Sequence, residues 1–569
     1  MKGSLEIAQE TTLTPITEIA THIGLQAGEF ENQGDWVAKV RFPQVLERLP
    51  ERREGSKYVL VTGITPTPLG EGKTVHTIGL TQALARLGKK AVACLRQPSM
   101  GPVFGIKGGA TGGGYSQVLP MEDINLGLTG DIDRVASAHN LLAALLDNHL
   151  LKGNKLGIDV NQVLLRRVMD MNDRVLRDIV VGLGGSKNGV PRQTGFDIAA
   201  ASEVMAILAL AHNYTDLRDR LGKIVVAYST DGEPVTSEDL RAAGVMAAIL
   251  KHALKPNLVQ TLEGQPCLMH AGPFANIAHG CSSIIADEVA LRLGDYVVTE
   301  AGFGADLGAE KFFDIKCRQS GLSPDAVVLV ASVRALKMHG GAYSVVPGKP
   351  IPKCLLEQED VESVRRGCEN LLRHVNNLRK FGLPVVVAVN TFASDTEAEL
   401  AVVREEALRG DVADVVATRL FLEGGAGGEE LAKAVVRAAD QPKSFQPLYP
   451  PDIPLRRKVE LVCSEIYGAS DVRFSQDVLN RLQQFENDGF GDLPICMAKT
   501  HLSLSDNPVL KGDPSKRGFV VEITDVRLSA GAGFVYPIAG SMLTMPGLPP
   551  SPSSENIDLD KDGRITGLF

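Results

Sequence analysis

Short apolar runs alternate along the chain with longer segments in which apolar residues recur every three to four positions. The runs at residues 58–63, 91–95 and 326–331 are apolar at consecutive positions, which is typical of strands covered on both faces. Residues 73–87 and 133–150 show the spacing of helices between such runs. The alternation predicts an α/β fold, with a parallel sheet whose strands are joined by crossover helices.

A second, smaller α/β pattern follows a loop that is rich in proline and glycine. Helices are predicted at residues 361–381 and 396–408, and strands at residues 385–389 and 413–417. Another proline cluster comes after the last of these strands and marks a further boundary. We therefore predict a large parallel-sheet domain and two smaller α/β or α+β domains, with the bounds 1–346, 347–453 and 454–569.

The composition is that of an ordinary folded enzyme rather than a nucleic-acid or membrane binder. The 569 residues include 59 Lys and Arg against 68 Asp and Glu, a net charge of −9, whereas binders of nucleic acids or anionic membranes usually have a basic excess. No apolar stretch approaches the roughly 20 residues of a membrane span. The eight cysteines form no C-x-x-C pair, and acidic residues near the N-terminus argue against a targeting peptide. We expect a soluble, cytoplasmic protein.

A glycine-rich segment lies between the strand at residues 58–63 and the helix that begins near residue 73. Its residues are Thr67, Pro68, Leu69, Gly70, Glu71, Gly72, Lys73 and Thr74. The setting and the Gly-Lys-Thr core predict a phosphate-binding loop (P-loop). Lys73 would reach the β- and γ-phosphates, and the Thr74 hydroxyl would bind Mg²⁺. Thr67 stands where the pattern has its first glycine, and the alternative is an ordinary turn with a solvated lysine.

Two further features point to an anionic ligand near the same sheet edge. Seven of the fourteen residues at 101–114 are glycines, which suggests close backbone approach to a ligand rather than a flexible linker. Arg96 directly follows the strand at residues 91–95, and ligands of open α/β sheets gather at the carboxyl ends of strands. Its guanidinium suits a carboxylate or phosphate, although a surface ion pair is the alternative.

With these segments assembled, the chain resembles the formate–tetrahydrofolate ligase family over nearly its whole length. The strings at residues 105–115 and 330–341 are the most specific, since many ATPases share the phosphate loop. Further matches lie at residues 196–198, 256–264 and 310–317. Because the resemblance begins close to Met1, we expect the monofunctional form.

The resemblance implies a reaction in which ATP, formate and tetrahydrofolate give 10-formyltetrahydrofolate, ADP and phosphate through formyl phosphate. It implies catalytic roles for Lys73, Arg96 and Asp131, with Asp131 receiving or relaying the N10 proton. It implies stacking of the folate ring on Phe392 and Phe421. Residues 1–346 would then bind nucleotide and formyl phosphate, and residues 347–453 would contribute to the folate cleft. Mg²⁺ with ATP, a monovalent cation and a homotetramer are also expected by resemblance.

Three departures from the family pattern affect this interpretation. Gln97 stands where many bacterial members have a glutamate linked to dependence on a monovalent cation. Phe421 stands in place of the bacterial folate-stacking tryptophan. Gly127 stands where the family usually has histidine, close to the reacting centre. The alternatives to an active ligase are therefore a catalytically impaired paralogue and a plain P-loop ATPase.

Overall fold

The computed structural model describes residues 2–105, 111–344, 351–540 and 542–568. The middle of the glycine-rich segment, residues 106–110, lies outside the described residues, as does the predicted boundary between residues 346 and 347. Predictions that fall on these residues stay predictions.

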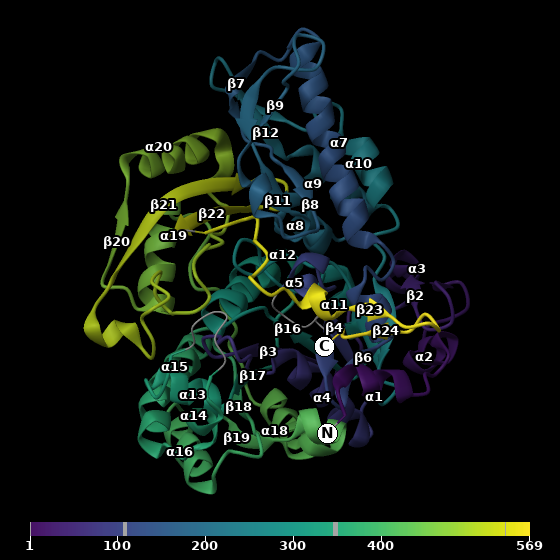
Figure 1. The fold of residues 1–569 in the computed structure, drawn as a ribbon, viewed down its shortest axis with the longest axis vertical. Coiled ribbons are helices and arrows are strands. Elements are labelled where there is room, and N and C mark those ends of the chain that lie inside the picture. Colours follow the sequence, from purple (N-terminus) through teal and green to yellow (C-terminus); the bar gives the residue numbers. More distant parts are fainter. Residues whose placement is uncertain (1, 106–110, 345–350, 541, 569) are drawn as a thin grey trace.

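One twelve-stranded sheet forms the centre of the fold (Figure 1). Its strands run parallel from β15 through β19, which confirms the mainly parallel α/β prediction. The other end is antiparallel, and the apolar runs gave no sign of this. The order across the main path is β1 (Phe30–Asn32), β2 (Ala38–Val40), β14 (Asn257–Thr261), β15 (Pro266–Met269), β4 (Ala91–Leu95), β16 (Tyr296–Glu300), β3 (Lys57–Gly63), β17 (Ala326–Ala331), β18 (Val385–Asn390) and β19 (Asp414–Thr418). Strands β5 (Gly112–Gly113) and β6 (Ser116–Leu119) pair beside β14.

Helices cover both faces of the parallel part of the sheet, which is why its strands are apolar at consecutive positions. Along β3, Val59 and Val61 pack on one face, in the cluster that contains residues of α4 and α18. Tyr58 and Leu60 point to the opposite face and join the main core. The covering helices are α4 (Lys73–Arg86), α11 (Ile284–Leu293), α13 (Val333–His339), α15 (Val361–Arg379), α16 (Glu397–Leu408) and α18 (Glu429–Ala439).

Strands β18 and β19, from the predicted second domain, extend the same sheet as β3 and β17. Helix α16 begins as its sequence predicts, because the Thr396 hydroxyl accepts from the Glu399 N–H and the Glu399 carboxylate accepts from the Thr396 N–H. Residues 351–439 are therefore continuous with the central sheet, and the carboxyl ends of β18 and β19 lie on the same edge as those of β3 and β4.

A second group of elements projects from the sheet at the top of Figure 1. It contains the long helix α7 (Asp131–Leu151) and the three-stranded sheet of β7 (Ile158–Val163), β12 (Val225–Ser229) and β13 (Pro234–Thr236). Helix α8 (Glu203–Leu210) lies at its base and is buried along most of its length. We call residues 158–236 the arm.

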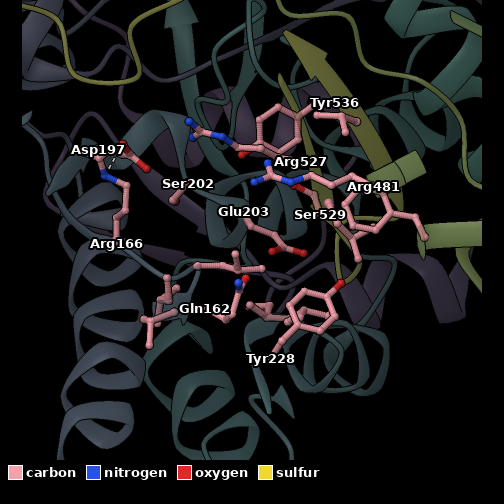
Figure 2. Close-up of a pocket in the computed structure, with 18 of the residues that line it drawn as sticks. Gln162, Arg166, Asp197, Ser202, Glu203, Tyr228, Arg481, Arg527, Ser529 and Tyr536 are labelled. Atoms are coloured by element: carbon pink, nitrogen blue, oxygen red, sulfur yellow. Dashed lines mark ion pairs between the residues drawn. The ribbon is translucent and has the colours of Figure 1, made fainter. Parts of the chain in front are cut away.

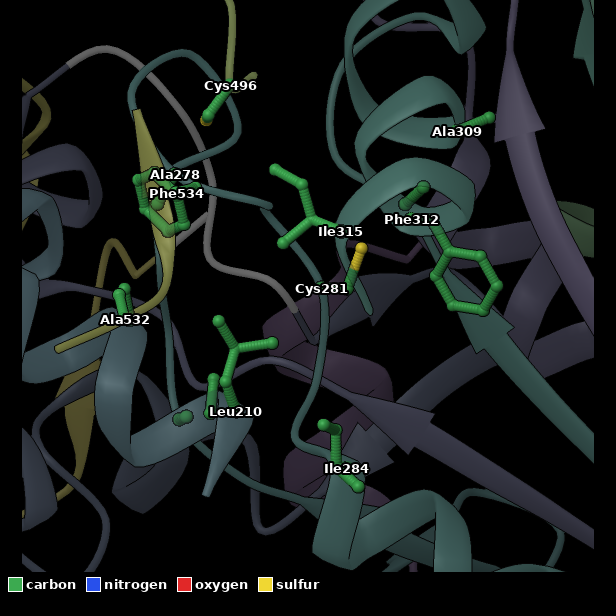
Figure 3. Packing of buried hydrophobic residues seen from close by; sticks show 14 of the residues in the cluster. Leu210, Ala278, Cys281, Ile284, Ala309, Phe312, Ile315, Cys496, Ala532 and Phe534 are labelled. Carbon is green, nitrogen blue, oxygen red and sulfur yellow. The ribbon is translucent and has the colours of Figure 1, made fainter. Parts of the chain in front are cut away.

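The C-terminal residues form a three-stranded sheet of their own, with β20 (Asp471–Phe474), β21 (Val520–Ser529) and β22 (Phe534–Ala539), beside helix α20 (Gln476–Phe485). Figure 3 shows Phe534 and Ala532 of this region near Leu210 of α8 and Ile315 of a π-helical segment. All four belong to one buried cluster, so the C-terminal sheet shares the main hydrophobic core. In the described part of the chain, no helix is long and apolar enough to cross a membrane.

Candidate active site

The loop between β3 and α4 folds around a buried acidic side chain. The Glu71 carboxylate accepts from the Thr67 N–H at 2.6 Å and lies 3.6 Å from the Lys73 Nζ. Gly70 and Gly72 both have positive φ angles, 77° and 86°, which glycine adopts without strain. Helix α4 begins at Lys73, so the loop presents a helix N-terminus at the carboxyl end of β3. Such an arrangement suits an anionic ligand.

The last residues of β18 and β19, two adjacent strands beyond β17 in the sheet, hold this loop and the start of α4 by hydrogen bonds. The Asn390 side chain donates to the Glu71 carbonyl at 3.2 Å, and a Cβ atom at Gly72 would lie 2.6 Å from its Nδ2. His76 donates from Nδ1 to the Gly72 carbonyl at 2.8 Å, and its Nε2 lies 2.8 Å from the Thr418 hydroxyl. Burial lowers the pKa of His76 to about 4, so the ring is neutral at physiological pH.

A glutamate that the sequence did not single out joins two of the predicted site residues. Glu300 ends β16, the strand between β3 and β4, and is 3% exposed. Its Oε2 accepts from the Thr74 hydroxyl at 2.8 Å, and its Oε1 lies 4.0 Å from Arg96 Nη2. The sequence offered one signal for Glu300, its position: an acidic residue at the carboxyl end of a central strand faces the edge of the sheet where ligands bind.

Arg96 lies at the end of β4 with its guanidinium only partly engaged. Its Nη1 donates to the Pro273 carbonyl at 3.0 Å, while Nε is buried without a hydrogen-bond partner among the described residues. The guanidinium of Arg96 packs against the backbone of Gly302, where any side chain would clash, because a Cβ atom there would lie 2.8 Å from Arg96 Nη2. The side chain is 20% exposed, so part of the guanidinium remains accessible to a ligand.

Asp131 lies at the start of α7 in a buried polar network rather than at a surface. Both of its oxygens accept from the Lys39 ammonium, and Oδ2 also accepts from Gln97 and Asn257 at 2.8 Å each. Burial acts to raise the pKa of Asp131, but the charge and hydrogen bonds of Lys39 hold it below its usual value. Lys39 was not predicted, because nothing in its local sequence marks it as buried.

Gly127 lies in the turn that leads into α7. Its φ angle is 113°, in the region that favours glycine, and nothing lies within 4 Å of the position a Cβ would take. A larger side chain therefore meets open space here but strains the backbone.

The two predicted folate-stacking rings follow adjacent strands. Phe392 is the second residue after β18, and the Arg334 guanidinium lies 3.8 Å from its ring centroid. Phe421 follows β19, is 38% exposed, and packs beside Gly113 and Gly114. Its carbonyl accepts from the Tyr115 N–H at 2.9 Å. No ring contact joins Phe392 to Phe421 among the described residues, so a flat ligand would have to approach each separately or lie between them.

The structure thus brings Lys73, Thr74 and Arg96 to one sheet edge, with Glu300 between them. Asp131 is connected to this group through Gln97, which follows Arg96 directly. The aromatic pair comes from the ends of the next strands along the same edge.

Comparison with known proteins agrees with this geometry. Residues 2–569 match the family model described as formate–tetrahydrofolate ligase. The chain is 57% identical to the formate–tetrahydrofolate ligase of Roseiflexus castenholzii over the whole of both chains. It is 56% identical to the protein of the same name from Desulforamulus reducens, with all of this chain and 99% of that relative covered. The chain belongs to the formate–tetrahydrofolate ligase family.

Proposed function

We propose that this protein ligates formate to tetrahydrofolate at the expense of ATP, giving 10-formyltetrahydrofolate, ADP and phosphate. The family match over residues 2–569 supports this reaction. The structural observation that carries the proposal is Glu300, which connects Thr74 of the loop to Arg96. A nucleotide phosphate on the loop and a formate carboxylate on Arg96 would then lie next to each other, as phosphoryl transfer between them requires.

In the first step, a formate oxygen attacks the γ-phosphorus of ATP, the bond to the β-phosphate oxygen breaks, and ADP leaves. The product is formyl phosphate, whose phosphate is a good leaving group. Catalysis of such a transfer is mainly positioning and charge neutralisation. Lys73 and the backbone N–H groups of the loop would bind the β- and γ-phosphates. Arg96 would hold the formate carboxylate and then the transferred group.

The residues at this point fit Mg²⁺ bound together with ATP. The Thr74 hydroxyl and the Glu300 carboxylate are oxygen ligands, which Mg²⁺ prefers, and their oxygens lie 2.8 Å apart. Among the described residues no cluster of three or more His, Cys, Asp or Glu could hold a metal. Thr74 and Glu300 would therefore share the ion with the phosphates, and the bound ion supplies positive charge against the transferring group.

In the second step, N10 of tetrahydrofolate attacks the formyl carbon, the carbon–oxygen bond to phosphate breaks, and N10 loses its proton. Phe392 and Phe421 would hold the folate ring by stacking. The lowered pKa of Asp131 and the four hydrogen bonds that its carboxylate accepts favour a positioning role over direct proton transfer. The departing phosphate carries an oxygen that can accept the N10 proton.

The alternatives of an impaired paralogue or a plain ATPase gain no support from the comparisons, since full-length relatives at 56–57% identity are named as the ligase.

We further propose a cytoplasmic homotetramer, which rests on the family resemblance alone. Gln97 has no carboxylate, and its amide donates to Asp131 at 2.8 Å, so we propose that it supplies no negative charge to a monovalent-cation site.

The test is an assay of the purified protein with MgATP, formate and tetrahydrofolate, followed by acid conversion of the product to methenyltetrahydrofolate and an absorbance reading. We expect signal only when all three substrates are present. Signal in wild-type protein would also show that Gly127 is tolerated. ADP release without formate or folate would support the ATPase, and nucleotide binding without any turnover would support the impaired paralogue.

A further inference from the structure

A cavity of about 660 Å³ lies between the arm and the C-terminal sheet, away from the proposed active site (Figure 2). Residues of β7, β12 and the start of α8 line one side, and residues of α20, β21 and β22 line the other. Lys73, Arg96, Glu300 and the two folate-stacking rings are not among its lining residues. Its volume is within the range of small-molecule sites, and its walls are rich in charged side chains.

Glu203, the first residue of α8, carries an unpaired carboxyl group in this cavity. Its Oε1 accepts from the Gly531 N–H at 2.7 Å and from the Ala532 N–H at 3.3 Å. Within the described part of the chain, no cationic side chain pairs with it. Figure 2 shows the carboxyl group in the space between Tyr228 and Arg481. Burial raises the pKa of Glu203 to about 7, against the effect of the two backbone hydrogen bonds, as expected of a carboxyl that lacks a cation.

The opposite wall has a surplus of positive charge. Arg481 Nη1 lies 2.6 Å from Asp525 Oδ1, and Arg527 Nε lies 3.1 Å from Asp525 Oδ2. Two guanidinium groups therefore share one carboxylate. Their side chains are 55% and 36% exposed, so further N–H groups remain accessible to a ligand.

The remaining charged residues strengthen this division between an acidic and a basic wall. On the arm side, Arg166 is already paired with Asp197 at 3.4 Å. Asp159 and Asp178 also line the cavity, and neither pairs with a cation among the described residues. The arm side thus has unpaired carboxyl groups, whereas the C-terminal side has two partly exposed guanidinium groups that share one carboxylate.

We propose that this cavity binds a small zwitterion, with its ammonium group on Glu203 and its carboxylate on Arg527 and Arg481. A carboxyl group without a cation and two guanidinium groups that share one carboxylate line the same cavity, yet Glu203 makes no ion pair with either arginine. A ligand that carries both charges would satisfy both walls through charge-assisted hydrogen bonds. A simple anion would leave the acidic wall unpaired, and a simple cation would leave the basic wall unpaired. Tyr228 and Tyr536 offer ring surface to the carbons that link the two charges.

The test is isothermal titration calorimetry of the full chain with glycine, γ-aminobutyrate and ε-aminocaproate, zwitterions of increasing charge separation. Butylamine and butyrate serve as ligands with one charge only. We expect at least one zwitterion to bind with one site per chain, and both single-charge ligands to bind about tenfold more weakly or worse. Binding of no zwitterion at millimolar concentration, or equal binding of a single-charge ligand, would overturn the proposal.

Two variants locate the bound zwitterion. Glu203→Gln keeps an oxygen acceptor for the Gly531 and Ala532 N–H groups but removes the charge, and we expect about tenfold weaker binding. Arg527→Gln should weaken binding to a similar extent. If Arg527→Gln does not fold, Arg481→Gln is tested in its place. The matched control is Arg437→Gln, an exposed arginine paired with Asp414 outside the cavity. Binding unchanged by Glu203→Gln would place the ligand elsewhere, for instance on Arg96, and would refute the assignment.

Discussion

Lys39 and Asp131 form a completely buried ion pair beneath the proposed active site. The Lys39 Nζ lies 2.7 Å from Oδ1 and 2.6 Å from Oδ2 of Asp131, and the two side chains are 0% and 1% exposed. Lys39 belongs to β2 and Asp131 begins α7, so the pair joins the antiparallel edge of the sheet to the long helix. Through Gln97, which also donates to Asp131, the pair fixes the chain directly after Arg96.

Lys39→Met should lower the free energy of unfolding by about 3–5 kcal/mol, because it leaves the Asp131 carboxylate buried without a cation. Urea unfolding measures this loss. The control is Lys433→Met, since the exposed Lys433–Glu430 pair should contribute less than about 1 kcal/mol. Adding Asp131→Asn to Lys39→Met should recover part of the stability by removing the uncompensated charge. Equal instability of the single and double variants would contradict this account.

Lys73→Ala should abolish synthesis of 10-formyltetrahydrofolate while leaving the fold intact. Removing Lys73 takes away the cation 3.6 Å from the buried Glu71 carboxylate, which keeps its hydrogen bond from the Thr67 N–H. We therefore expect a less stable protein with the same fold. The measurement is the three-substrate assay, with far-UV circular dichroism to verify the fold. Lys433→Ala is the matched control for loss of a lysine. Wild-type turnover in Lys73→Ala would mean that the loop does not bind the ATP phosphates.

The strands of the central sheet were predictable because both of their faces are covered, which makes their sequences continuously apolar. The strands predicted at residues 91–95 and 326–331 are β4 and β17 with the same bounds. Strand β2 was missed because it has only three residues, with the buried Lys39 at its centre. Strand β14 is as long as β4 but was missed because it carries buried polar residues such as Asn257 and Gln260. The roles of Lys39 and Glu300 depend on partners far away in sequence, at Asp131, Thr74 and Arg96. No local pattern names these partners, although the place of Glu300 at the carboxyl end of a strand indicated the ligand edge.

Glu300→Gln should reduce turnover by about a hundredfold and raise the Mg²⁺ concentration needed for half-maximal rate. The amide oxygen can still accept from the Thr74 hydroxyl, but the charge that faces Arg96 and would attract Mg²⁺ is lost. The assay is repeated over a Mg²⁺ titration. Glu430→Gln, at an exposed site, is the control. An unchanged Mg²⁺ dependence would remove Glu300 from the metal site.

Phe421→Ala should raise the KM for tetrahydrofolate about tenfold and leave the KM for ATP unchanged, because a lost stacking contact costs about 1 kcal/mol or more. Phe421→Trp is the matched variant, since it offers a larger ring at the same exposed position and should lower the KM for tetrahydrofolate. Phe392→Ala should act in the same direction as Phe421→Ala. Equal changes in the KM values for ATP and folate would indicate a structural rather than a stacking role.

His76 should make the protein less stable as the pH falls. Burial lowers its pKa to about 4 in the folded protein, against about 6.5 in the unfolded chain. Between these values only the unfolded chain binds the proton, so the stabilisation is complete above pH 6.5 and is lost as the pH falls towards 4. The difference of about 2.5 pKa units corresponds to about 3 kcal/mol.

His76→Gln isolates this contribution, because an amide can donate to the Gly72 carbonyl but does not titrate. Other buried histidines with pKa values lowered to about 4, among them His270, His339 and His374, titrate equally in both proteins and cancel in the comparison. Urea unfolding of both proteins from about pH 7 to about pH 4 should therefore give a flatter stability profile for the variant, by about 3 kcal/mol over the range. Parallel profiles would mean that the pKa of His76 is the same in the folded and the unfolded chain, so that burial does not keep its ring neutral.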